Sequence, residues 1–379
     1  MKILCLLDRV PYRERCGGEY WQSQILDYLK EDNEVLLAVT DGENISQYSQ
    51  EKNIETVLIE KSVAVPDSME KLFPFNVSEF YEWKYDASLG ENINALVLKY
   101  SPDVIFYSSS CFFRYISKFG NIKKIFLCSQ IRYMFYYRLG KTVLPGVNLL
   151  VNQFARIVEK IEKKACVFSD RILFASNSDM NRINSNLQLF TPSYYIPISM
   201  EKKPLKPIPN NHHVVLWGDF ASYHGRKAYN LYIKNFHNIF KNLYNDYSLT
   251  LSGKPDPRLI TDEWTDVSPD LTDELLWDTK LLFFPYNFRL NYDYALIKAL
   301  SYGVPVGGFY KFFNDVVGNN RNCIMGKTVG EIRDKLKDVG LKNDILDEKR
   351  KNLYNLAGNN FTCERFRKTM DVFMEELKK

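Results

Sequence analysis

Short apolar runs alternate with amphipathic segments along this chain, and this alternation constrains its fold more than any other feature. The runs are bounded by turn residues, as in KILCLL (residues 2–7), EVLLAV (residues 34–39) and VVLWG (residues 214–218). Strands that alternate with helices predict a parallel sheet, because a parallel crossover needs a long connection that is usually a helix. The chain is therefore predicted to have an α/β fold.

The alternation is interrupted once, by the segment MEKKPLKPIPNN, and then starts again. This segment contains three prolines and has no periodicity, which is typical of a linker. A chain of 379 residues, 45% of them apolar, can form two cores of ordinary size. We predict two doubly wound, Rossmann-like domains that face a cleft, at residues 1–199 and 213–360, joined by a linker at 200–212.

Several classes of protein are disfavoured by the composition. No apolar run reaches the roughly 18–20 residues that a membrane span needs, and the first apolar run is too short for a signal peptide. The seven cysteines are odd in number and scattered, without the spacing of a zinc site, and the four histidines show no metal-ligand spacing. We expect a cytoplasmic protein without a metal site.

One long segment is free of acidic residues. Residues 104–158 contain 8 Lys and Arg but no Asp or Glu, whereas residues 1–103 contain 10 Lys and Arg against 19 Asp and Glu. Aromatic residues are interleaved with these cations. Cations beside stacking surfaces suit a nucleic acid, and they also suit an anionic membrane surface. Core aromatics beside a solvated basic face would produce the same pattern.

The order of motifs resembles that of GT-B fold glycosyltransferases, in the large retaining group that uses nucleotide sugars. The resemblance spans nearly the whole chain and rests on a Gly-Gly loop after the first strand and on three longer stretches. These are EKKACVFSDRILFASNSDMNRI, VVLWGDFASYHGRKAYNLYIKNF and LLFFPYNFRLNYDYALIKALSYGVPVGG. The resemblance implies a hexosyl- or pentosyltransferase that uses a nucleotide sugar as co-substrate, and a final helix, residues 361–379, that returns to the first domain.

Two groups of residues are candidates for binding the donor. Gly17 and Gly18 precede a helix, where glycine permits close backbone approach and the helix start offers free N–H groups, although a plain tight turn would look the same. Arg226 and Lys227 are expected in a loop, where two cations can stabilise a departing nucleotide diphosphate, although a solvated helix start would look the same. The resemblance gives this catalytic role to such a pair.

Further donor contacts are implied near these cations. Gly218 follows a strand where the family usually has Gly-Arg, and His224 lies beside the proposed cations, although a loop histidine is often simply solvated. Metal-dependent sugar transfer commonly needs an Asp-x-Asp pair. None follows a strand in a suitable context here, so metal-independent transfer is expected.

The helix predicted within YALIKALSYGVPVGG departs from the family pattern. The resembled enzymes usually carry two Glu in this region, one of which accepts hydrogen bonds from the donor ribose, whereas this chain has Lys298 and Asn291 at those positions. Lysine has no acceptor lone pair, so Asp293 or the backbone would have to hold the ribose, with Lys298 on a phosphate or a nearby acid. Alternatively, Lys298 points away and the donor site has changed or been lost.

The acceptor is expected in the first domain. Gln130 stands where the family often has His and can hydrogen-bond a sugar or acceptor hydroxyl, although a simple strand cap would look the same. Arg132, Tyr133 and Arg138 belong to the acid-free segment. We predict DNA that carries a hydroxymethylated base as the acceptor, because viral DNA glycosyltransferases resemble this plan and the composition suits an AT-rich genome such as a phage's. The alternatives are a transferase for envelope polysaccharide or glycolipid, with peripheral membrane contact, and a sugar-nucleotide-binding protein without turnover.

Overall fold

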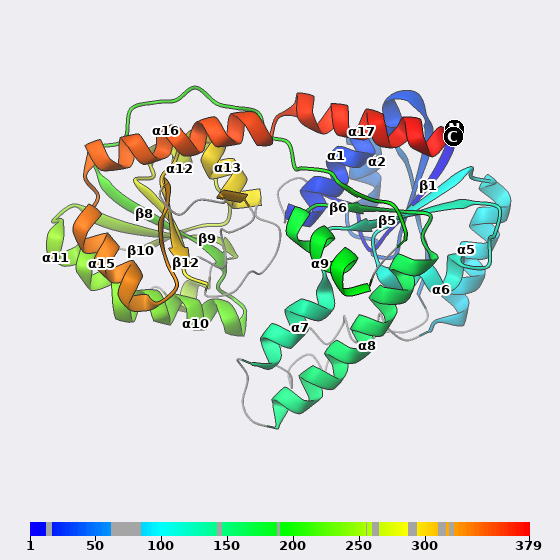
Figure 1. Ribbon diagram of the computed structural model, residues 1–379, viewed down its shortest axis with the longest axis horizontal. Coiled ribbons are helices and arrows are strands. Elements are labelled where there is room, and N and C mark those ends of the chain that lie inside the picture. Colours follow the sequence, from blue (N-terminus) through cyan, green and yellow to red (C-terminus); the bar gives the residue numbers. More distant parts are fainter. Residues whose placement is uncertain are drawn as a thin grey trace. The chain divides into compact units, whose positions relative to one another are not determined.

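The structure is a computed structural model that describes residues 1–12, 17–61, 85–141, 146–187, 190–254, 256–259, 265–286, 294–309, 316–317 and 322–379. The chain divides into two compact units. The first comprises Met1–Ile198 and Phe366–Lys379, and the second comprises Ser199–Arg365. Each unit has its own sheet and its own buried core (Figure 1).

The described strands of the first unit form a seven-stranded parallel sheet in the order β3-β2-β1-β4-β5-β6-β7. Its strands are β1 (Lys2–Leu7), β2 (Glu34–Val39), β3 (Glu55–Leu58), β4 (Val104–Tyr107), β5 (Lys123–Cys128), β6 (Arg171–Phe174) and β7 (Ser193–Tyr195). The strand order reverses at β1 and β4, as expected for a doubly wound sheet.

The helices of the first unit pack around this sheet. They are α1 (Gly17–Asp32), α2 (Ile45–Lys52), α5 (Ala87–Tyr100), the short η1 (Ser110–Phe112), α6 (Phe113–Ile116), α7 (Arg132–Gly140), α8 (Val147–Phe168) and α9 (Asn177–Leu187). The last helix of the chain, α17 (Cys363–Lys378), also packs here, because the ring of Phe373 lies 6.2 Å from that of Phe106 and Lys123 Nζ donates to the Leu377 carbonyl at 2.5 Å.

The strands that the structure describes in the second unit form a six-stranded parallel sheet in the order β10-β9-β8-β11-β12-β13. Its strands are β8 (His212–Asp219), β9 (Tyr247–Lys254), β10 (Thr265–Ser268), β11 (Leu281–Phe284), β12 (Val306–Phe309) and β13 (Ile324–Gly326). Its helices are α10 (Tyr223–Tyr232), the π-helical η2 (Ile233–His237), α11 (Asn238–Leu243), η3 (Pro257–Leu259), α12 (Asp273–Asp278), α13 (Tyr294–Tyr302), α15 (Val329–Val339) and α16 (Asn343–Asn360).

Helices cover both faces of the second sheet: Figure 1 shows α10 and α15 on one side, and α12 and α13 on the other. Right-handed crossovers that leave a switch point in opposite directions must use opposite faces. Two doubly wound parallel α/β units are therefore confirmed. None of the described helices is both long and apolar enough to cross a bilayer.

The proline-rich segment that was predicted as a linker lies along the second unit. The N–H of Met200 donates to the Phe361 carbonyl at 2.7 Å, Tyr354 donates to the Lys203 carbonyl at 2.5 Å, and Arg350 donates to the Lys206 carbonyl at 2.6 Å. These bonds satisfy backbone groups that proline prevents from entering a helix or a sheet. The segment is therefore held in place by α16.

Candidate functional site

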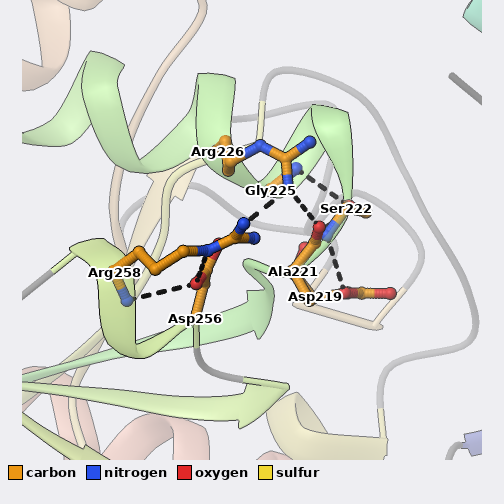
Figure 2. Close-up of polar contacts among 7 residues, drawn as sticks. All are labelled: Asp219, Ala221, Ser222, Gly225, Arg226, Asp256 and Arg258. Carbon is orange, nitrogen blue, oxygen red and sulfur yellow. Dashed lines mark hydrogen bonds and ion pairs between the residues drawn. The ribbon is translucent and has the colours of Figure 1, made fainter.

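The strand order of the second sheet reverses between β8 and β11, and ligands of open α/β sheets bind beside the carboxyl ends of strands at such a point. The chain leaves β8 at Asp219, makes a short turn and enters α10. The N–H groups of Phe220 and Ala221 donate to the Lys254 carbonyl at 2.8 and 3.2 Å, which ties this turn to the end of β9. The turn, the adjoining end of β9 and the start of α10 are here called the corner. The candidate site is built on this corner (Figure 2).

Ser222 starts α10 in the manner of a helix N-cap. Its Oγ accepts from the N–H of Gly225 at 3.0 Å and donates to the Asp219 carbonyl at 2.7 Å. Capping lets the helix begin at Tyr223, because an orphan N–H of the first turn is satisfied. Arg226 and Lys227, which were expected in a loop, therefore lie in the first turns of α10.

Three glycines allow the helix to start this close to the strand ends. A Cβ on Gly225 would lie 1.7 Å from the Asp219 carbonyl oxygen, and a Cβ on Gly218 would lie 2.0 Å from the Tyr286 hydroxyl oxygen. Gly253 has a φ of +105°, and a Cβ there would meet the Gly218 carbonyl oxygen at 2.6 Å. The structure thus gives Gly218, a predicted donor-binding residue, a packing role against Tyr286.

A buried carboxylate brings two guanidinium groups to the start of α10. Asp256 is only 4% exposed, and it accepts from Arg258 Nε at 2.8 Å and Nη2 at 2.9 Å. Arg226 Nη1 donates to the Ala221 carbonyl and lies 3.9 Å from Asp256 Oδ2, the oxygen that also accepts from Arg258 Nη2 (Figure 2). Hydrogen bonds from Arg258 hold the pKa of Asp256 below its usual value, so this carboxylate stays ionised and anchors both cations.

The corner therefore combines several groups that attract an anion. Lys227 is exposed in α10. Lys254 lies at the end of β9, and its Nζ is 4.0 Å from a carboxyl oxygen of Asp219. His224 belongs to the first turn of α10, but its side chain is outside the described part of the structure. The positive end of a helix, beside Arg and Lys, is suited to binding phosphate.

Lys298 lies on α13, in agreement with the helix predicted there. Its side chain is half-buried, and its Nζ donates to the Leu271 carbonyl, just before α12, at 2.5 Å. The ammonium group also lies 5.8 Å from the centre of the Tyr294 ring. These contacts give Lys298 a structural role within the second unit. The other two predicted ribose contacts, Asn291 and Asp293, lie outside the described residues.

Replacing Lys298 with glutamate is expected to lower the free energy of unfolding by about 1–3 kcal/mol, because a carboxylate cannot donate to the Leu271 carbonyl. Urea denaturation of Lys298→Glu and of the uncharged Lys298→Met checks this. Calorimetry with nucleotide on the folded variant tests the predicted donor contact. A loss of about 2 kcal/mol or more of binding free energy supports a phosphate contact, and unchanged affinity refutes it.

In the first unit, Gly17 and Gly18 form the start of α1. A Cβ on Gly18 would lie 3.2 Å from the Oγ of Ser129, so the helix start closely approaches the residue that follows β5. Gln130, the predicted acceptor contact, comes next in the chain and is half-buried. The Gly-Gly pair and Gln130 thus belong to the same edge of the first sheet.

The three other predicted acceptor residues lie on α7. Arg132 is the first residue of α7, and its Nη2 lies 3.3 Å from a carboxyl oxygen of Asp8, the residue that follows β1. Tyr133 is only 5% exposed and belongs to the core. Arg138 is half-buried in the last turn.

Most aromatic residues of the acid-free segment are part of the core of the first unit. Phe135 and Tyr137 are half-buried. The buried ones are Phe106, Tyr107, Phe112, Phe113, Tyr115, Phe126, Tyr133, Tyr136 and Phe154. Their burial leaves little of the stacking surface on which the prediction of a nucleic-acid acceptor partly rested.

The side chain of Glu162, on α8, caps the N-terminus of α7. Its two carboxyl oxygens accept from the N–H groups of Arg132 and Tyr133 at 2.9 and 3.0 Å. Burial raises the pKa of this carboxyl group to about 7, and the two N–H bonds only partly offset that effect. Glu162 therefore fixes the position of α7 beside the end of β5.

Glu162 is expected to make the protein less stable as the pH rises from about 4.5 to about 7, because the folded state then binds more protons than the unfolded state. The full effect of such a shift is roughly 3 kcal/mol. Glu162→Gln should remove this contribution, so the difference in unfolding free energy between wild type and variant should change across that interval. Urea denaturation at several pH values checks this, and a constant difference refutes it.

Sequence reasoning did not single out Asp256, Arg258, Asp8 or Glu162. The Asp-Pro-Arg spacing just after β9 was a usable signal for the first two, since a strand end is where side chains meet a ligand. Asp8 likewise follows the first strand. Nothing in the sequence pairs Glu162 with the start of α7, because the partners are about thirty residues apart.

Comparison with family models and with curated proteins finds no match. Among solved structures, the chain is similar to sucrose-phosphate synthase from Thermosynechococcus elongatus, with a TM-score of 0.73 and 12% identity over 100% of this chain and 99% of that one. It is also similar to Anabaena HepE in complex with UDP and glucose (TM-score 0.68, 10% identity, 98% and 99% covered). WaaG, a glycosyltransferase involved in lipopolysaccharide biosynthesis, has a TM-score of 0.68 and 12% identity, with 98% and 99% covered. These likenesses show that the chain has the GT-B fold.

Proposed function

We propose that this protein is a glycosyltransferase that moves a sugar from a nucleotide sugar to an acceptor hydroxyl. The observation that carries the proposal is the cationic start of α10 at the switch point of the second sheet, where Arg226 stands beside the Asp256–Arg258 pair and Lys227 is exposed one residue further on. The fold supports it, because glycosyltransferases are among the structures that are similar to this chain over nearly its whole length.

The chemistry asked of this corner is stabilisation of a leaving group. In the proposed step the bond between the sugar and the terminal phosphate oxygen breaks, and the acceptor hydroxyl oxygen forms the new bond to the sugar. The hydroxyl proton passes to a donor phosphate oxygen. Negative charge grows on the departing diphosphate, and Arg226, Lys227 and the N-terminus of α10 would stabilise it. We propose that transfer needs no metal ion, since these cations supply the charge, and that the sugar keeps its anomeric configuration.

A nucleoside diphosphate sugar is the proposed donor. HepE, which has the same fold, was solved in complex with UDP and with UDP-glucose, and this supports testing uridine donors first. The same test, made with hexose and pentose donors, also decides which kind of sugar is transferred. Gly17, Gly18, His224, Asn291 and Asp293 remain predicted donor contacts.

The acceptor is the less constrained half of the reaction. DNA with a hydroxymethylated base, as in phage genomes, stays a prediction that rests on the cations of residues 104–158, now without most of the stacking surface. A glycolipid or envelope polysaccharide acceptor is the second candidate, and the exposed face of α8 described below favours it. A sugar-nucleotide-binding protein without turnover is the non-enzymatic alternative.

Incubation with a panel of nucleotide sugars tests the proposal. Release of nucleoside diphosphate, with or without acceptor, supports a transferase, and binding without release from any donor supports the non-enzymatic alternative. Mass spectrometry of hydroxymethylated DNA and of lipid extract from the same incubations identifies the acceptor class. Nucleotide sugars that neither bind nor react would refute the proposed function.

A further inference from the structure

Helix α8 has a regular inner face. Its inward residues pack beneath α7 and against the sheet of the first unit, and they include Val151, Phe154, Val158 and Ile161. A 22-residue helix is roughly 33 Å long, so it exposes an extended outer face on its other side. A helix on the surface of a globular domain normally carries polar side chains on that face.

The exposed positions of α8, here called the outer face of α8, do not follow that rule. Five of them are apolar. They are Leu149, Leu150, Ile157, Val167 and Phe168, with exposed fractions of 65%, 54%, 47%, 62% and 55%. The apolar side chains therefore run from the first turn of the helix to its last turn. Single exposed apolar residues need no explanation, but a series along one helix face indicates a contact surface.

The remaining exposed positions are nearly all basic. They are Arg156, Lys160, Lys164 and the neutral Gln153. The outer face of α8 thus combines five apolar side chains with three cations and contains no carboxylate.

The two acidic residues of α8 are turned away from this face. Glu162 is buried under the start of α7. Glu159 is half-buried, lies 2.8 Å from Lys163 and accepts from the Tyr137 hydroxyl at 2.8 Å. The charge of the outer face of α8 is therefore uniformly positive.

A further apolar side chain lies beside the end of this helix. Phe190 is fully exposed, and its neighbour Thr191 donates to the Cys166 carbonyl at 3.2 Å. That bond holds the chain around Phe190 next to the last turn of α8, where Val167 and Phe168 are exposed. The apolar surface at this end thus contains residues from two separate parts of the sequence.

We propose that the outer face of α8 binds an anionic lipid surface. Lysine and arginine would contact the headgroups, and the leucine, isoleucine and phenylalanine side chains would enter the boundary with the acyl chains. A nucleic acid would engage the cations but would offer no apolar partner to the four aliphatic side chains of this face. The proposal does not depend on sugar transfer, since lipid binding is measured directly.

Co-sedimentation with vesicles tests the proposal. The wild-type chain should bind vesicles made of equal parts phosphatidylcholine and phosphatidylglycerol, and bind much less to phosphatidylcholine alone. Lys160→Gln with Lys164→Gln should lower the partition coefficient about 30-fold, which corresponds to about 1 kcal/mol for each lost charge. Leu149→Ser with Leu150→Ser, which leaves the charge unchanged, should lower it at least about tenfold.

Matched variants separate this surface from general charge and hydrophobicity. Leu98→Ser removes an apolar side chain of α5 that is 68% exposed, and Lys337→Gln with Lys342→Gln removes two exposed cations of the second unit. Both should keep wild-type vesicle binding. Wild-type chain that does not bind anionic vesicles, or control variants that lose binding equally, would overturn the proposal. So would binding of duplex DNA in place of vesicles, with the leucine variant unaffected.

Discussion

Lys227→Gln is expected to reduce the rate of sugar transfer by about 10²–10³-fold, which is the usual cost of removing one group that stabilises charge in a transition state. Lys227 is exposed in the first turns of α10, so its loss should leave the fold intact. The reduction should appear in kcat as well as in kcat/KM, because the charge on the diphosphate grows only as the sugar leaves.

Lys234→Gln is the matched control for this prediction. Lys234 is exposed in η2, the continuation of the same helical run, but about three turns away from the positive end of α10. Steady-state kinetics with the donor found by the panel should show wild-type rates for Lys234→Gln. Equal loss in both variants would mean that general surface charge matters and that Lys227 has no specific role.

Gly225→Ala is expected to lower the free energy of unfolding by about 3–5 kcal/mol, at the upper end of effects from a single added methyl group. The new Cβ would lie 1.7 Å from the Asp219 carbonyl oxygen and 2.6 Å from the Cα of Phe220. Both are backbone atoms held by the turn between β8 and α10, so no side-chain movement relieves the overlap. The start of α10 must shift, and nucleotide affinity should fall with stability.

The control for Gly225→Ala is the same substitution in another helix. Gly330 lies in the first turn of α15, and the nearest atom to its added Cβ is 3.8 Å away. Gly330→Ala should be neutral or stabilise the protein by up to about 1 kcal/mol, because alanine restricts the unfolded chain and favours helix. Thermal and urea denaturation of both variants check the contrast. Similar stabilities would show that the turn before α10 is looser than described.

The strands and most helices could be predicted because their signals are local. Apolar runs bounded by turn residues marked β1, β2 and β8, and the helical spacing with a glycine stop marked α13. The start of α10 was placed too late because the capping role of Ser222 was not recognised, although a serine before a helical segment is itself a local signal.

The proline-rich segment shows a different limit. Its composition predicted a segment without helix or strand, as residues 200–211 are, but composition does not say which surface such a segment lies on. Its contacts come from Arg350, Tyr354 and Phe361, roughly 150 residues further along the chain. Only folding brings these partners together.

The sequence by itself determined the two α/β halves of this protein, their parallel strands and the cations that follow β8, because periodicity, turn residues and charge are properties of short segments. The tertiary structure decided that Asp256 holds Arg226 and Arg258 together, that Glu162 caps α7, and that Lys298 donates to a backbone carbonyl. It also decided that most aromatics of residues 104–158 are core while the outer face of α8 stays exposed. Burial and side-chain pairing depend on contacts between residues that are distant in the chain. Local sequence patterns do not specify those contacts.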